Sequence, residues 1–139
     1  MFAPGFFTGH LIRRFGVLTI MLVGCALMFL TIVIAHAGLT YWHFWFALFA
    51  LGVGWNFMFV AATTLLTTTY TTAEKAKVQG VNDLTVFITM ISSSAASGAL
   101  LSTSGWTDLN LYALPALVLA TLGAVVLMLR PAHRRLKAT

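Results

Sequence analysis

The chain has 139 residues, of which 60% are hydrophobic and only 8% are charged. Soluble domains carry about 25% charged residues, so a water-soluble globular protein is excluded and lipid must surround most of the chain. The formal net charge of +5 does not indicate nucleic-acid binding. The basic residues all fall in short segments between long apolar runs, which is the pattern of membrane topology signals. The composition therefore predicts an integral membrane protein.

The apolar runs have the length of membrane-spanning helices. Residues 1–9 are apolar but too short to cross a bilayer, and we interpret them as the end of a preceding helix. Four longer uncharged stretches follow, and their length and lack of period-two alternation favour helices over barrel strands. The predicted fold class is all-α, a polytopic membrane protein with four transmembrane helices in a single domain. The spans cover about residues 15–35, 44–67, 84–103 and 109–129, and a basic tail follows at 130–139.

The distribution of cations predicts the orientation of the spans. Two basic residues precede the first span, two lie between the second and third, and four follow the last. The other two connections contain no Lys or Arg, so the positive-inside rule places the basic side and both termini in the cytoplasm. Trp42, Trp45 and Trp106 then fall at the outer interface, where amphipathic aromatic rings are enriched.

A glycine- and arginine-containing segment, GHLIRRFG, occupies residues 9–16. Gly9 and Gly16 would permit tight turns with φ angles that other residues avoid. Arg14 would lie at a helix end, where a cation meets carbonyl groups or lipid phosphates. Anchoring of the membrane topology is one interpretation of this segment, and a gating latch is the other.

A second polar segment, TTAE, begins at Thr71 and matches a capping box. In such a box the Thr71 hydroxyl and the Glu74 carboxylate bind free amide hydrogens at a helix start. The next helix would carry Lys75 and Lys77 on its wet turns and enter the membrane near Asp83. For Asp83 the alternatives are a local ion pair with a lysine and an interdomain contact that breaks when the cytoplasmic side opens.

Several polar side chains lie inside the predicted spans. Asn56 is the most polar of them, and Thr63 and Thr67 follow on the same helix face. Two interpretations stay open for this stripe, interhelical hydrogen bonding and the lining of a substrate path. Thr89 and Ser93 in the third span are weaker candidates for a cavity wall. The many small residues of that span predict close helix packing.

The chemistry that is missing from the sequence is informative as well. The three carboxylates all lie at or beyond span ends, so none is placed to carry a coupling proton or to bind sodium. The sequence contains no phosphate-binding loop, no His/Cys ligand set and no nucleophile with a base at recognisable spacing. We therefore expect no enzyme activity, no metal site and no cofactor.

Two segments resemble the major facilitator superfamily of secondary transporters. Residues 9–16 are similar to the family's GxLxDRxGR loop between the second and third helices of each six-helix half. Residues 52–83 are similar to the fourth helix and following cytoplasmic loop of the carboxy-terminal half in bacterial members. The sequence departs from the loop pattern at Arg13, which stands where the acidic residue belongs, and at Val17, which replaces a basic residue. The resemblance covers the whole chain and implies the end of helix eight followed by helices nine to twelve.

The resemblance also implies a function. It predicts transport of a small solute by alternating access in the bacterial cytoplasmic (inner) membrane, with this chain as part of the transporter. The expected partners are the lipid bilayer, the solute, and either a missing amino-terminal portion or further copies of the chain. Two alternatives stay open, a non-transporting fragment or accessory membrane subunit, and a small dimeric four-helix exporter. The exporter would need a membrane-embedded acid, which this sequence lacks.

Overall fold

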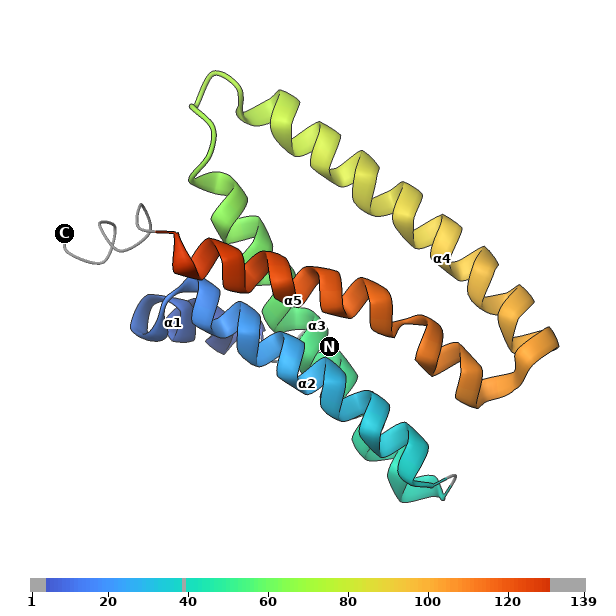
Figure 1. Cartoon of the computed structure of the whole chain (residues 1–139). Helices are drawn as coiled ribbons and strands as arrows, with labels where there is room; N and C mark the ends of the chain where they lie inside the picture. Colours follow the sequence, from blue (N-terminus) through green and yellow to red (C-terminus); the bar gives the residue numbers. More distant parts are fainter. Residues whose placement is uncertain (1–4, 39, 131–139) are drawn as a thin grey trace.

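Five helices make up the part of the chain that the computed structural model describes, residues 5–38 and 40–130 without the side chains of 104–110. Three helices, α2, α3 and α4, are long and apolar enough to cross a membrane, whereas α5 is a shorter apolar helix of 16 residues. The all-α fold class is confirmed. Residues 1–4 of the expected stub and 131–139 of the expected tail lie outside the described residues. The helices are α1 (Gly5–Phe15), α2 (Val17–Ala37), α3 (Tyr41–Thr67), α4 (Lys75–Tyr112) and α5 (Leu114–Leu129) (Figure 1).

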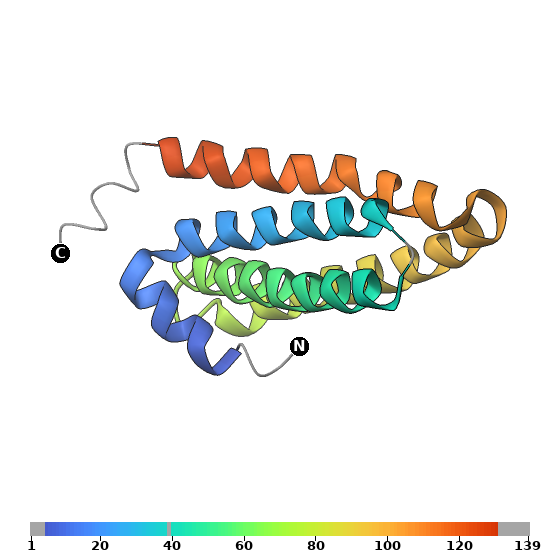
Figure 2. The same cartoon turned by 90° about the horizontal axis from the view of Figure 1, so that it is seen from below.

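The helices form a layered bundle with one outlying member. In Figure 2, α5, α2 and α3 run side by side with α2 in the middle, and α1 crosses the end of this layer at an angle. The α2 and α3 helices share the most extensive contact, and α5 packs along α2. In Figure 1, α4 runs apart from α2 and α3 and bends back toward α5 at its carboxy-terminal end.

Small residues allow the close approach of α2 and α3. A Cβ atom added to Gly24 would lie 2.9 Å from the carbonyl oxygen of Gly54, and one added to Gly54 would lie 3.0 Å from the carbonyl oxygen of Gly24. Ala47, Ala50 and Ala61 are buried on the same side of α3. Backbone-to-backbone packing of this kind is a usual route to helix association in lipid, where burial of apolar surface gives no driving force.

The break between α1 and α2 occurs at Gly16. This residue has φ 89°, a conformation that only glycine adopts without strain. Gly9, in contrast, lies inside α1, so the expected end of a helix near residue 9 is wrong. The helix continues because Ile12 is buried against Ile20 and Ala61, which holds the turn after Gly9 on the bundle.

Threonine hydroxyls close the carboxy-terminal end of α3. Thr67, Thr68 and Thr69 each donate a hydrogen bond of 2.7 Å to the carbonyl oxygen three residues earlier. The carbonyl oxygens of Leu65 and Leu66 also accept the backbone amides of Thr68 and Thr69, so hydroxyl and amide together close this helix end. The Gln79 side-chain amide then donates to the Tyr70 hydroxyl at 2.8 Å and ties the connection to the first turns of α4.

The boundary between α4 and α5 differs from the sequence prediction. The expected turn at 102–108 is helical in its backbone, and α4 ends only at Tyr112. The α5 helix begins at Leu114 rather than at 109, with Pro115 in its first turn. Proline lacks the amide hydrogen that a continuing helix requires, but it fits the first turn of a new one.

The α4 helix has no close packing partner in the described part of the chain. None of its residues in the apolar window within 75–103 is buried. A Cβ atom on Gly98, in the middle of its small-residue segment, would meet nothing within 4 Å. The close packing that the small residues predict is therefore found at Gly24 and Gly54 and not on α4.

The contact between α2 and α3 can be tested with a pair of glycine substitutions. Gly24→Ala places a methyl group against the backbone of α3, so we expect a loss of about 1–3 kcal/mol of stability. Gly52→Ala is the matched control, because a Cβ atom there meets nothing within 4 Å and alanine favours the helix. Thermal unfolding of both variants in detergent, followed by circular dichroism, measures the difference. Equal midpoints for the two variants would contradict the close backbone approach.

Candidate functional site

A cavity of about 560 Å³ lies between α2, α3 and α5, with one wall contributed by α4. Its volume is within the range of small-molecule sites. Trp55 and Phe44 contribute aromatic rings, and Met28 and Met58 contribute thioether side chains. The cavity is positioned by the contact between α2 and α3, because the residues of α3 that line it flank the face that carries Gly54.

The walls of the cavity are apolar and uncharged among the described residues that line it. Two hydroxyl groups are the exceptions. Thr31 donates to the Leu27 carbonyl oxygen at 3.0 Å, and Thr89 donates to the Thr85 carbonyl oxygen at 2.8 Å. Each hydroxyl oxygen keeps lone-pair capacity for a donor on a ligand. The cavity is therefore suited to an uncharged, largely apolar molecule with a few hydrogen-bonding groups.

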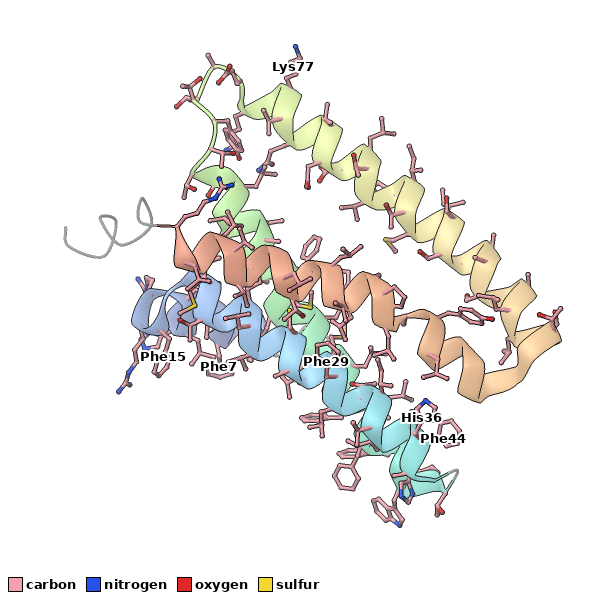
Figure 3. All side chains as sticks on the ribbon, in the orientation of Figure 1. Phe7, Phe15, Phe29, His36, Phe44 and Lys77 are labelled. Atoms are coloured by element: carbon pink, nitrogen blue, oxygen red, sulfur yellow. The ribbon has the colours of Figure 1, made fainter. Side chains whose placement is uncertain are left out.

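Two aromatic residues, Phe44 and Trp55, line part of the cavity. Trp55 stacks on Phe59 with ring centroids 4.8 Å apart and an interplanar angle of 13°. Phe44 lies near the start of α3, at the same end of the bundle as His36 at the end of α2 (Figure 3). Planar ligands stack on such rings with a contribution beyond the area they bury. These residues are absent from the sequence prediction, because an aromatic residue in an apolar span looks the same whether it faces lipid or a cavity.

The polar stripe expected on the second span does not line this cavity. The Thr8 hydroxyl of α1 donates to the Asn56 side-chain oxygen at 2.8 Å, and Thr8 is fully buried. The Thr63 hydroxyl donates to the Phe59 carbonyl oxygen at 2.7 Å, within its own helix. Thr67 makes the equivalent bond within α3. Of the two interpretations, the structure favours interhelical hydrogen bonding for Asn56.

The weaker candidates on α4 separate from one another. Thr89 lines the cavity, whereas Ser93 is exposed one turn later. Of the five residues expected to form a substrate path, the structure therefore brings only Thr89 to the cavity. Whether any of the five contacts a solute stays a prediction.

The glycine–arginine segment forms the second half of α1. Arg13 and Arg14 lie in its last turn, and both side chains are exposed. The Arg14 guanidinium carbon lies 5.5 Å from the centre of the Phe15 ring. Cations at this position interact favourably with the negative end of the helix dipole. The two expected glycines, Gly9 and Gly16, lie inside α1 and at the break after it.

The cap at the start of α4 involves the two predicted residues, Thr71 and Glu74, but their hydrogen bonds differ from those of a capping box. The backbone amide and the hydroxyl of Thr71 both donate to the Glu74 carboxylate, at 3.3 and 2.9 Å. The Glu74 amide donates to the Thr71 carbonyl oxygen instead of the hydroxyl. Lys75 and Lys77 are exposed on the first turn of α4, and Lys77 points away from the bundle (Figure 3).

The two other carboxylates are Asp83 and Asp108, and only Asp83 has a described side chain. The Asp83 carboxylate accepts a hydrogen bond of 3.3 Å from the Asn82 side chain. Within the described chain it forms no ion pair with Lys75 or Lys77, so the expected local pair is not observed. Asp108, like Trp106, has a side chain outside the described residues. A search of the described residues finds no group of His, Cys, Asp and Glu side chains that could hold a metal ion.

Comparison with known proteins identifies the family. A profile of the Major Facilitator Superfamily matches residues 2–139. The chain belongs to this superfamily. The riboflavin transporter RfnT of Brucella anthropi is 44% identical over 131 residues, which are 94% of this chain and 33% of that protein. The uncharacterized MFS-type transporter YdeG of Bacillus subtilis is 32% identical over 114 residues, 80% of this chain and 26% of that protein.

Membership of the major facilitator superfamily confirms the resemblance carried by the two sequence motifs. The chain spans a third or less of the length of the curated relatives it matches. No solved structure matches the chain significantly. Both relatives carry the name of transporters, which agrees with an integral membrane protein.

The hydrogen bond between α1 and α3 generates a prediction. We expect a double-mutant cycle of Thr8→Val and Asn56→Leu to give a coupling of about 0.5–1.5 kcal/mol, because the bond joins two helices away from water. The free energies of unfolding of the wild type, both single variants and the double variant supply the value. Thr63→Val is the control, since its hydroxyl bonds only to its own helix. Additive effects of Thr8→Val and Asn56→Leu would contradict the bond.

Proposed function

We propose that this chain is part of a secondary transporter that moves a small solute across the bacterial cytoplasmic membrane by alternating access. The profile match over residues 2–139 and the three membrane-length helices carry the proposal. In this superfamily the solute binds between two six-helix halves built from inverted repeats. A complete transporter therefore requires helices beyond the five described. The exposed α4 supports this inference, because the residues of its apolar window are unburied among the described helices. A longer chain containing this sequence, or further copies of it, would cover α4.

We further propose that both termini lie in the cytoplasm. The three groups of basic residues lie on one side of the predicted spans, which supports this orientation. In the structure, the ends of α1 and α3 and the start of α4 bring the arginines and lysines of the first two groups to the same end of the bundle (Figures 1 and 2).

For the solute we propose a planar, uncharged heteroaromatic compound of the riboflavin class. One relative is named a riboflavin transporter, and the cavity supplies what such a molecule would need. Trp55 offers a ring for stacking, the methionines offer polarisable contacts, and Thr31 and Thr89 offer hydroxyl oxygens for ring or ribityl donors. The absence of a charged group among the described lining residues fits an uncharged solute.

Uptake of labelled riboflavin tests the proposal. The transporter that carries this sequence is expressed in cells that lack their own riboflavin uptake. We expect Trp55→Ala to reduce the rate at low substrate concentration roughly tenfold, the loss of one aromatic stacking contact of about 1.4 kcal/mol. Trp45→Ala is the matched control, because Trp45 lies on the same helix but is 48% exposed, stacks on the exposed Phe49 and contacts the exposed Phe46 edge to face.

The uptake rates are compared at equal membrane levels of the variants, and each outcome leads to a different conclusion. No riboflavin uptake by the wild type would overturn the solute class but not the superfamily. Uptake that falls equally in Trp45→Ala and Trp55→Ala would contradict the cavity as the site. Uptake that falls only in Trp55→Ala would support both the solute and the cavity.

A further inference from the structure

The exposed face of α1 combines aromatic and cationic side chains in a fixed order. Phe6 and Phe7 at the start of the helix are 88% and 71% exposed. His10 follows one turn later, and Arg13 and Arg14 follow in the last turn, all exposed. At 3.6 residues per turn these five side chains share one face of the helix. Figure 3 labels Phe7 and Phe15 at the end of the bundle where α1 lies.

The orientation of this face is held by the opposite side of α1. Thr8 is fully buried and donates its hydroxyl hydrogen to Asn56 of α3. Ile12 is buried against Ile20 and Ala61. A rotation of α1 that hid the phenylalanines would break both contacts. The exposure of the aromatic and cationic face therefore follows from the packing of the bundle.

The two arginines have no anionic partner in the described chain. Arg13 replaces the acidic residue of the superfamily's loop pattern, so two cationic residues follow one another where the pattern has an acid next to a base. Of the described carboxylates, Glu74 accepts from Thr71 in the connection between α3 and α4, and Asp83 accepts from Asn82 within α4. The described residues therefore supply no anion to this end of α1.

We propose that the exposed face of α1 binds an anionic phospholipid. The phosphate lies between Arg13 and Arg14, and the acyl chains lie along Phe6 and Phe7. Guanidinium groups match phosphate oxygens with paired hydrogen bonds. The contact between Arg14 and Phe15 restrains one of the two groups on the helix end. Arg13 follows Phe6 by seven positions, which is a rise of about 10 Å along the helix axis. The face therefore extends from the level of the acyl chains to that of the headgroups.

The apolar half of this face argues for a lipid over a soluble anion. A free phosphate would need only the arginines, whereas a phospholipid also covers the two most exposed phenylalanines of α1. The net charge of +5 adds long-range attraction to an anionic surface. This inference concerns α1 alone and does not depend on the identity of the transported solute.

Lipid titration of the full 139-residue chain in detergent micelles tests the site. Phosphatidylglycerol and phosphatidylcholine with identical acyl chains are added, and the lipid bound per chain is counted by native mass spectrometry. We expect the wild type to retain phosphatidylglycerol preferentially. Replacement of both arginines, R13Q with R14Q, should reduce that preference roughly tenfold or more, because it removes the charge-assisted hydrogen bonds to the phosphate.

A matched double variant separates a local site from net charge. K75Q with K77Q removes the same number of charges from exposed positions at the start of α4. We expect it to keep the preference for phosphatidylglycerol. An equal loss in both double variants would overturn the site in favour of general electrostatic attraction, and so would a wild type without preference. Far-UV circular dichroism checks that each variant keeps its helices.

A second pair of measurements separates a lipid from a soluble anion. F6A with F7A should weaken phosphatidylglycerol binding and leave the weak binding of soluble glycerol phosphate unchanged. Glycerol phosphate that binds the wild type as tightly as the lipid would overturn the assignment of a lipid, and so would unchanged lipid binding by the phenylalanine variant.

Discussion

The backbone contact between Gly24 and Gly54 is the constraint on which the rest of this structure depends. In lipid, apolar side chains gain nothing by meeting one another, so α2 and α3 associate because their backbones fit together closely. That contact leaves two flanks of α3 available to other parts of the structure. One flank, with Trp55 and Met58, becomes the wall of the cavity, and the opposite flank, with Asn56, is covered by α1. The bulky residues follow the arrangement that the two glycines permit.

The helices differ in how closely they pack against the rest of this chain. The α2 and α3 helices hold the core, α1 is tied to them by Ile12 and the bond from Thr8, and α5 packs along α2. The α4 helix keeps an unburied apolar span whose hydroxyls turn to its own backbone, as in the bond from Thr89 to Thr85. Such a helix is stable in lipid but specifies no neighbour within the described chain. This contrast agrees with a chain that spans a third or less of its relatives.

The sequence predicted the fold class well because long apolar runs without alternation have few other solutions in a membrane. Boundaries were less predictable. The pair Arg13 and Arg14 suggested a loop, but the burial of Ile12 extends α1 to Phe15. Pro115, rather than the polar turn before it, decides where α5 begins. The cavity could not be predicted, because Trp55 and Phe44 belong to it only once α2, α3 and α5 are packed together.

Polar residues inside a span are poor guides to a transport path unless their hydrogen bonds are known. A threonine hydroxyl reaches the carbonyl oxygen of its own helix, as Thr63 does, so it faces lipid or protein at little cost. An asparagine side chain has two donors and an acceptor and cannot satisfy them this way, which is why Asn56 meets Thr8 of another helix. The same reasoning favours Thr31 over Thr63 as a ligand contact. Thr31 bonds to the Leu27 carbonyl oxygen of its own helix and, at 3.4 Å, to the Ala47 carbonyl oxygen of α3, but it is buried and lines the cavity, which Thr63 does not.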